Sequence, residues 1–266
     1  MKKWFWKIVL AASLIVMVVA LINIVSLTLE YQKGIHTYQK LEEYVEVEEP
    51  SDAINATQPE ENAEEVESVI PIDLNVDFEG LAAINDDVVG WIYYEPLDIS
   101  YPIVRGDDND YYTHYTFENE QNSSGAIFMD FLNRPDFSDF NTIIYGHNMR
   151  NGTMFGSLKK LLNDTTLIEE NPYFYVFTKD QAFMYEICSA YITTESSHTY
   201  DLVQTLEEKQ DFVDYMKQVS VYFWNNPLFD TEVQDDTKLI TLSTCHGLHS
   251  KNRTVIHGVL IAEENR

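Results

Sequence analysis

The most informative stretch of the chain reads Lys-Leu-Ile-Thr-Leu-Ser-Thr-Cys and covers residues 238–245. Its apolar and β-branched residues predict a strand, in which successive side chains point to opposite faces of a sheet. Ser243 and Cys245 then share one face, and Cys245 stands at the end of the strand. A thiol at a strand end is exposed enough to react. The stretch therefore predicts both a β-strand and, at its end, a candidate nucleophile.

Runs of similar character recur along the C-terminal part of the chain, bounded by Asn, Asp, Gly and Pro. Helical periodicity is confined to 77–85, 154–162 and 206–219, with Asp77 as a possible N-cap and Thr205 with Glu208 as a capping box. Eight strands without alternating long helices predict a mostly antiparallel, closed β-barrel. The predicted strands cover residues 90–94, 99–104, 125–130, 142–145, 173–178, 183–194, 238–245 and 254–262.

The N-terminus carries an apolar run over residues 8–29, after Lys2, Lys3 and Lys7. About 20 apolar residues cross the hydrocarbon core of a membrane as a helix. A cleaved signal peptide has a shorter apolar run and an Ala-x-Ala-like site, and no such site precedes Glu30. The run therefore predicts an uncleaved single-pass anchor. Because the lysines precede it, residues 1–7 are expected in the cytoplasm and the bulk of the chain outside the cell.

Charge divides the remainder of the chain. Residues 41–79 hold fourteen Asp or Glu, and no Lys or Arg occurs between Leu41 and Val104. This composition predicts an acidic extracellular stalk over 30–75, of which 42–68 is solvated and extended by its own repulsion and 30–41 can continue the anchor helix briefly. A folded domain over 76–266 follows. The chain has 266 residues and a formal net charge of −27. Such a charge argues against nucleic acid and against anionic lipid headgroups as partners.

Two further residues lie where strand ends would bring them near Cys245. His147 follows the predicted strand 142–145, and Arg253 precedes the strand 254–262 across a short loop from Cys245. Acyl transfer at sulfur needs the thiolate, and an imidazole can accept and donate the proton. A guanidinium stays charged, so it fits a fixed donor to the oxyanion of the transition state. Together the three side chains predict a thiol-based acyl-transfer site.

Plainer interpretations compete with this one. A cysteine on a strand is usually a buried small hydrophobe, and Cys188 fits that description better than Cys245. The same pattern also fits His147 as a turn residue and Arg253 as a solvated surface charge. A Cys188–Cys245 disulfide also stays open as a structural role for both cysteines.

A zinc site is a rival for the same region, because Cys245, His246, His249 and His257 are ligand types that zinc accepts. The second cysteine pair that usually completes such a site is missing. His257 lies in a strand of alternating apolar residues, where a packed, hydrogen-bonded imidazole fits better. We therefore expect no metal and no cofactor.

These motifs resemble those of class B sortases, the membrane-anchored cysteine transpeptidases of Gram-positive bacteria. The Asn-Met-x-x-Gly-x-Met-Phe continuation over 148–155 resembles class B rather than class A. The resemblance spans about 76–261 and rests on Val-Val-Gly-Trp-Ile (88–92), Tyr-Pro-Ile-Val (101–104), Asp-Asn-Asp-Tyr-Tyr (108–112), Asn-Thr-Ile-Ile-Tyr-Gly-His-Asn-Met (141–149) and Thr-Leu-Ser-Thr-Cys (241–245).

The resemblance implies an eight-stranded sortase-type barrel with N-terminal helices and a helix, at 206–219, in the loop before the Cys strand. It implies that Cys245 attacks the carbonyl of a Thr residue in the sorting signal of a surface protein, which gives a thioacyl enzyme. His147 would protonate the leaving amine, and Arg253 would position the substrate and steady the oxyanion. An amine of a peptidoglycan precursor would then resolve the intermediate.

By the same matching, Asn109, Tyr145 and Ser243 would line the substrate groove. One departure concerns His246, because class B relatives can carry an acidic residue directly after the cysteine. Two other functions stay open from the sequence. One is a thiol endopeptidase that hands the acyl group to water, and the other is a surface-binding module without catalytic activity.

Overall fold

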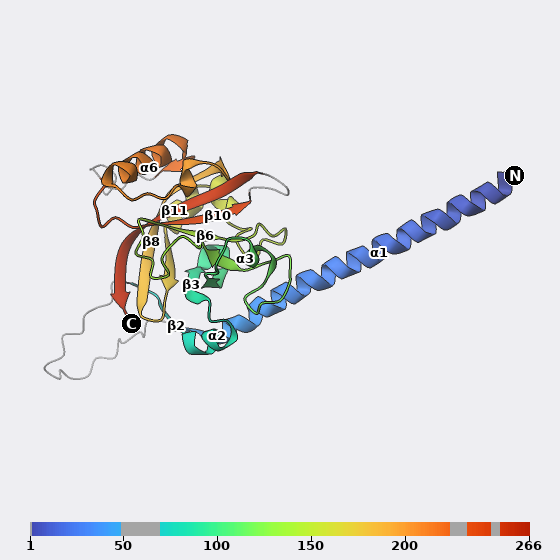
Figure 1. Ribbon diagram of the computed structural model, residues 1–266, viewed down its shortest axis with the longest axis horizontal. Helices are drawn as coiled ribbons and strands as arrows, with labels where there is room; N and C mark the ends of the chain where they lie inside the picture. Colours follow the sequence, from blue (N-terminus) through green and yellow to red (C-terminus); the bar gives the residue numbers. More distant parts are fainter. Residues whose placement is uncertain (1, 49–69, 224–232, 246–250) are drawn as a thin grey trace.

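Eight strands close into a barrel in the computed structural model, which describes residues 2–48, 70–223, 233–245 and 251–266 (Figure 1). Pairing of β8 with β11 closes the ring. The predicted fold class is confirmed, and each predicted strand is found within a few residues of its expected bounds. In order of hydrogen bonding the strands are β11 (Asn252–Asn265), β10 (Leu239–Cys245), β6 (Asn141–Tyr145), β5 (Ile127–Met129), β4 (Ile99–Val104), β3 (Val88–Tyr94), β7 (Tyr173–Phe177) and β8 (Gln181–Thr194).

Neighbouring barrel strands are mostly antiparallel, as predicted, but β6 pairs with β10 in parallel and β4 pairs with β5 in parallel. Three further strands were not predicted. β9 (Tyr222–Phe223) pairs with β8, and β1 (Val45–Glu48) pairs with β2 (Asp73–Val76) outside the barrel. The parallel pair β6–β10 matters for function, because parallel neighbours bring the ends of both strands to the same rim.

The two faces of β10 bury different side chains, as its period of two predicts. Ile240 and Leu242 belong to the main core inside the barrel, together with Trp91. Leu239, on the other face, packs with Phe212 of α6 (Leu206–Val219) in a second cluster. Helix α6 therefore covers the outer surface of the barrel (Figure 1).

Two of the three predicted helices match in detail. α2 (Phe78–Ile84) begins after Asp77, whose Oδ1 accepts a hydrogen bond from the Gly80 backbone N–H at 2.8 Å. α6 begins after Thr205, and the predicted capping box with Glu208 is present. It lies in the connection that leads to the Cys strand, where the resemblance placed it. The structure also contains the short helices α3 (Tyr111–His114) and α5 (Thr166–Glu170) and the 3₁₀ turns η1 (Glu42–Tyr44), η2 (Glu95–Leu97) and η3 (His198–Tyr200).

The prediction of one helix over 154–162 was wrong. Met154 has φ +54°, outside the helical region, and forms an isolated bridge with Asn148. A helix, α4 (Lys159–Asn163), begins only at Lys159. The apolar spacing nevertheless indicated burial correctly, since Phe155, Leu158 and Leu161 are fully buried. Successive turns can bury residues at such spacing as well as one helix can.

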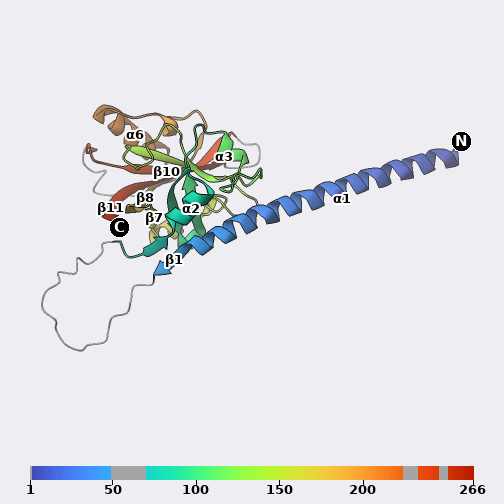
Figure 2. The ribbon, with the colours of Figure 1, turned by 60° about the horizontal axis from the view of Figure 1, so that its bottom comes forward.

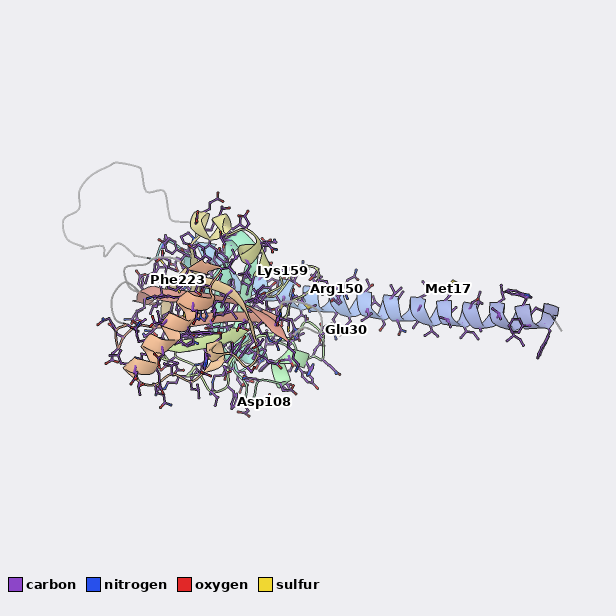
Figure 3. All side chains as sticks on the ribbon, turned by 90° about the horizontal axis from the view of Figure 1, so that it is seen from above. Met17, Glu30, Asp108, Arg150, Lys159 and Phe223 are labelled. Atoms are coloured by element: carbon purple, nitrogen blue, oxygen red, sulfur yellow. The ribbon has the colours of Figure 1, made fainter. Side chains whose placement is uncertain are left out.

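The N-terminal helix α1 is longer than the predicted anchor and runs from Lys2 to Leu41. Its first part projects away from the barrel with exposed apolar side chains such as Met17, and its last turns reach the barrel near Glu30 (Figure 3). There Tyr38 and Leu41 are buried in the main core. Figure 2 shows that the helix ends beside α2 and β1.

This packing changes the boundary drawn at residue 75. Residues 30–48 and 70–75, which were assigned to a solvated stalk, contain buried side chains and, together with Val76, form the β1–β2 pair. The sequence favoured a stalk because residues 42–68 are acidic, polar and poor in aromatic side chains, yet Tyr38, Leu41 and Leu74 suffice to dock the flanking segments. The centre of the predicted stalk, 49–69, lies outside the described residues. Within the described ranges, α1 is the helix that is long and apolar enough to cross a membrane.

Candidate active site

Three strand ends meet at one rim of the barrel. β10 lies between β6 and β11, so that Ser243 is opposite Tyr145 and Cys245 is opposite Arg253. Continuing the parallel register by two residues places Cys245 level with His147. The predicted nucleophile, acid/base and cation are therefore brought together by strand pairing over a separation of about a hundred residues in sequence.

A cavity of about 320 Å³ opens at this rim. The structure brings together all the residues that the sequence predicted for the site. The predicted residues in its lining are Cys245, His147, Arg253, Ser243, Tyr145 and Asn109, and the others are Thr113, Phe128, Gly146, Glu195, Tyr200 and Thr244.

The two cysteines have different environments. Cys245 is partly exposed, whereas Cys188 is fully buried and its Sγ donates to the carbonyl of His257 at 3.5 Å. Burial raises the pKa of the Cys188 thiol well above its usual range, so it is a poor source of thiolate. Both cysteines are free thiols, which excludes the Cys188–Cys245 disulfide that the sequence left open. The accessible thiol is that of Cys245.

His147 lies in the turn after β6, and one edge of its ring is fixed. Nε2 lies 2.7 Å from the backbone carbonyl oxygen of Thr113, to which only an N–H can donate. In the neutral ring Nδ1 therefore carries the lone pair. Burial lowers the pKa of His147, the Thr113 hydrogen bond opposes this, and the nearby charge of His114 lowers it further. A neutral imidazole with its lone pair at Nδ1 has the protonation state of a base that can accept a thiol proton.

Arg253 is held at the wall of the cavity by an ion pair. Its NH2 lies 3.1 Å from Oε2 of Glu195, which follows directly after β8. The Arg253 charge reaches the cavity, because it partly offsets the rise in pKa that burial causes at Tyr145 and Tyr200. A planar guanidinium fixed in this way can direct its donors without a change of protonation state.

The neighbouring wall is an ordered polar network. The Tyr145 hydroxyl and the Asn109 amide both donate to Oδ2 of Asp130, each at 2.9 Å. Tyr200 stacks on Tyr145 with 6.2 Å between ring centroids, and its hydroxyl lies 2.8 Å from Oγ of Ser243. A peptide in the cavity would therefore meet hydroxyl and amide groups whose orientation is already fixed.

Five residues that organise the site were not predicted from the sequence: Thr113, Asp130, Asn148, Glu195 and Tyr200. Thr113 acts through its backbone carbonyl, which no side-chain pattern reveals. Glu195 and Tyr200 lie in the connection after β8, whose place beside β10 depends on tertiary structure. Asn148 had a signal, because it adjoins His147 in the Tyr-Gly-His-Asn motif. Its Nδ2 donates to the carbonyl of Cys245 at 2.7 Å and ties the histidine turn to the end of β10.

His257 forms the centre of a buried polar network on the outer side of the barrel. The Thr241 hydroxyl donates to Oδ1 of Asn141 at 2.6 Å, so it must accept from His257 Nδ1–H at 2.9 Å. Nε2 then accepts from the Tyr191 hydroxyl at 2.8 Å. Both ring nitrogens are engaged in hydrogen bonds, as expected for a packed imidazole. The other histidines of the rival zinc site, His246 and His249, lie outside the described residues.

His257 should make the protein sensitive to acid. Burial lowers its folded-state pKa to about 3, below an unfolded value of about 6.5. The unfolded chain therefore binds more protons at low pH, and stability is lost as the pH falls below about 6.5. A shift of this size corresponds to about 4–5 kcal/mol once the pH reaches about 3. The free energy of unfolding in urea, measured from pH 7.5 to 4, should fall less steeply for His257→Gln than for the wild type.

An exposed histidine provides the control for this titration. His198 is a surface residue paired with Asp201, so His198→Gln should follow the pH dependence of the wild type closely. Equal slopes for the wild type and His257→Gln would show that the buried imidazole does not govern acid stability.

Comparison with known proteins gives the same family from sequence and from structure. The family model of the sortase domain matches residues 92–261. Sortase B of Listeria monocytogenes is 39% identical over 188 residues, which cover 69% of this chain and 73% of that protein. A solved structure of sortase B from Bacillus anthracis aligns with a TM-score of 0.67 at 30% identity, covering 88% of this chain and 99% of that chain.

A Staphylococcus aureus sortase B–substrate complex aligns with a TM-score of 0.63 at 32% identity, covering 69% of this chain and 84% of that chain. These relatives share the closed barrel, and the cavity at its rim here holds a free cysteine. The chain belongs to the class B sortases and is a cysteine transpeptidase.

Proposed function

We propose that this transpeptidase cleaves a Thr-containing sorting signal of surface proteins and transfers the acyl group to an amine of a peptidoglycan precursor. The observation that supports this most directly is the cavity at the barrel rim, where Cys245, His147 and Arg253 converge. The S. aureus relative in complex with its substrate is consistent with a sorting signal as the ligand of such a site.

The first half-reaction forms the thioacyl enzyme. His147 takes the proton of the Cys245 thiol, and the thiolate attacks the carbonyl carbon of the Thr residue. The carbonyl oxygen becomes an oxyanion, next to the guanidinium of Arg253. When the C–N bond breaks, the imidazolium of His147 gives its proton to the leaving amine. The negative charge of the oxyanion thus develops next to the fixed guanidinium of Arg253, which stabilises the transition state of acylation.

The second half-reaction reverses these roles with a new amine. The acceptor amine attacks the thioester carbonyl and loses a proton to His147. The tetrahedral intermediate then collapses, the new amide is released, and the Cys245 thiol is regenerated. Transfer to an amine rather than to water requires that the amine competes for the thioester.

We further assign Asn109, Tyr145 and Ser243 to the substrate groove. All three line the cavity beside the proposed catalytic residues, and their polar groups are held by Asp130 and Tyr200. Fixed donors and acceptors can orient an extended peptide whose backbone groups need partners.

The proposed location is the cell membrane, with residues 1–7 in the cytoplasm, 8–29 across the bilayer and the barrel outside. The length and composition of α1 and the lysines before its apolar run support this orientation. Protease added to intact protoplasts should shorten the chain on a denaturing gel, by cutting in the acidic segment between the anchor and the barrel. A chain that is fully protected until the membrane is permeabilised would reverse the orientation.

The function is tested by the products formed from one peptide library. Peptides with Thr at the scissile position are incubated with the enzyme and a primary-amine peptide, and the products are identified by mass spectrometry. The expected product is the new amide, in an amount that rises with the amine concentration. Acid product that is insensitive to the amine would indicate a thiol endopeptidase. The absence of any product across the library would indicate a binding module.

A further inference from the structure

The last turns of α1 dock onto one loop of the barrel, the connection 115–125 between α3 and β5. Gly34 faces this loop, and a Cβ there would lie 2.8 Å from Oγ of Ser124, so the glycine permits the close approach. The contacts are Asn122 Nδ2–H to the Glu30 carbonyl (3.0 Å), the Ser123 backbone N–H to Glu30 Oε1 (2.9 Å), Lys33 Nζ to Glu120 (2.9 Å) and Thr37 Oγ1–H to Glu118 (3.4 Å).

Tyr38 reaches furthest into this interface. Its hydroxyl donates to the backbone carbonyl of Gly125 at 2.5 Å, and it accepts from the backbone N–H of Phe117 at 3.4 Å. Phe117 lies near the start of the loop and Gly125 at its end. One buried hydroxyl on α1 therefore bridges both sides of the loop.

Gly125 is in turn packed against the catalytic histidine. Its φ is +54°, and a Cβ there would lie 2.9 Å from Cδ2 of His147 and 3.0 Å from the carbonyl oxygen of Thr113. The same Thr113 oxygen accepts the hydrogen bond from His147 Nε2. The fixed edge of the His147 ring, Cδ2 and Nε2, is thus enclosed by Gly125 and Thr113, and the Gly125 carbonyl is held by Tyr38.

We propose that Tyr38 is a positioning residue for His147, so that the end of the membrane-anchor helix holds the loop that orients the catalytic imidazole. The proposal rests on the acid/base role given to His147 above. It predicts that the Tyr38 hydroxyl affects chemistry at the histidine although it does not line the active-site cavity. It also means that α1 contributes to the active site in addition to any role in the membrane.

Other titratable groups also surround His147. His114 lies on α3 beside Thr113, and Cys245, Arg253 and Glu195 line the cavity with His147. None of these contacts Tyr38 in the described structure. The hydrogen bond to the Thr113 carbonyl raises the pKa of His147. If Gly125 and Thr113 become less ordered around the ring, this hydrogen bond should weaken and the pKa of His147 should fall.

The test replaces one hydroxyl in the full-length chain, purified in detergent micelles. Tyr38→Phe keeps the ring and removes the bond to Gly125. Tyr94→Phe is the matched control, because the buried Tyr94 hydroxyl also donates to a backbone carbonyl, that of Asn171 at 2.8 Å, away from the cavity. The titration of His147 is followed by NMR with labelled histidine, and His147→Gln identifies its signal among the seven histidines.

In Tyr38→Phe the midpoint of the His147 titration should move to lower pH by about 0.3–0.5 unit, and in Tyr94→Phe it should stay in place. Acylation of Cys245 should slow by about three- to tenfold at unchanged peptide KM. This is the range expected if the free energy of one buried hydrogen bond is lost from the positioning of His147. An unmoved or raised midpoint in Tyr38→Phe, or equal shifts in both variants, overturns the proposal. Full activity of His147→Gln would instead overturn the acid/base role, and the NMR titration does not depend on that activity.

Discussion

Replacement of Cys245 by Ala is expected to abolish both cleavage and transfer, with a loss of about 10⁴-fold or more. No other described group in the cavity can form the thioacyl intermediate, and removal of a catalytic nucleophile costs at least this much in comparable enzymes. The measurement is a product assay with peptide and amine, in which the Cys245→Ala variant should match the uncatalysed background. A variant that still binds the peptide would show that the loss is chemical.

Cys188→Ala is the matched control for this loss. The Cys188 thiol is fully buried beside Tyr191 and Val255, and its pKa is raised, so its removal should leave most of the activity. It should instead cost stability, by about 0.5–3 kcal/mol for a buried side chain. A folded Cys188→Ala variant without activity, next to an active Cys245→Ala variant, would invert the assignment of the nucleophile.

The barrel could be predicted from the sequence because its strands carry strong local signals. β4, for example, combines β-branched residues with Tyr101, and β10 combines Ile240, Thr241 and Thr244 with two leucines. The parallel pairing of β6 with β10 could not be predicted from local signals, since it joins segments about a hundred residues apart. Without that register, the meeting of His147 with Cys245 stayed a hypothesis based on motifs.

The errors arose where tertiary contacts decide the local structure. The apolar spacing around Phe155 suggested a helix, but Met154 takes a left-handed conformation in the turn that follows His147. The acidic composition of residues 41–79 suggested a stalk over 30–75, but Tyr38, Leu41 and Leu74 are buried in the core. In both cases a few buried side chains outweigh the average character of the segment.

The proposed site was predictable for its side chains but not for the groups that hold them. Cys245, His147 and Arg253 stand out because their chemistry is specific. Thr113 contributes only a carbonyl, and Glu195 becomes significant only once Arg253 is seen 3.1 Å away. Preorganisation of this kind is a property of the folded chain, because it depends on which backbone and side-chain groups meet in space.

Replacement of Arg253 by Ala should slow acylation of Cys245 by about 10²–10³-fold, roughly 3–4 kcal/mol, with a smaller effect on peptide binding. The reason is that a fixed donor at the oxyanion acts mainly in the transition state. Arg253→Lys keeps the charge but not the planar fork, so it should restore only part of the rate. The measurement is single-turnover acylation of the wild type, Arg253→Lys and Arg253→Ala, after each is shown to be folded.

The structure offers a control that separates catalysis from loss of an ion pair. Lys238 directly precedes β10 and forms an ion pair with Glu263 of β11 at 2.8 Å. Its side chain is 27% exposed, close to the 23% of Arg253. Exposed pairs of this kind contribute about 0–1 kcal/mol to stability, so Lys238→Ala should leave acylation nearly unchanged. If Arg253→Ala lost less than about threefold, as a surface charge would, or no more than Lys238→Ala, the guanidinium would not act on the oxyanion. The site would then work with the Cys245–His147 pair alone.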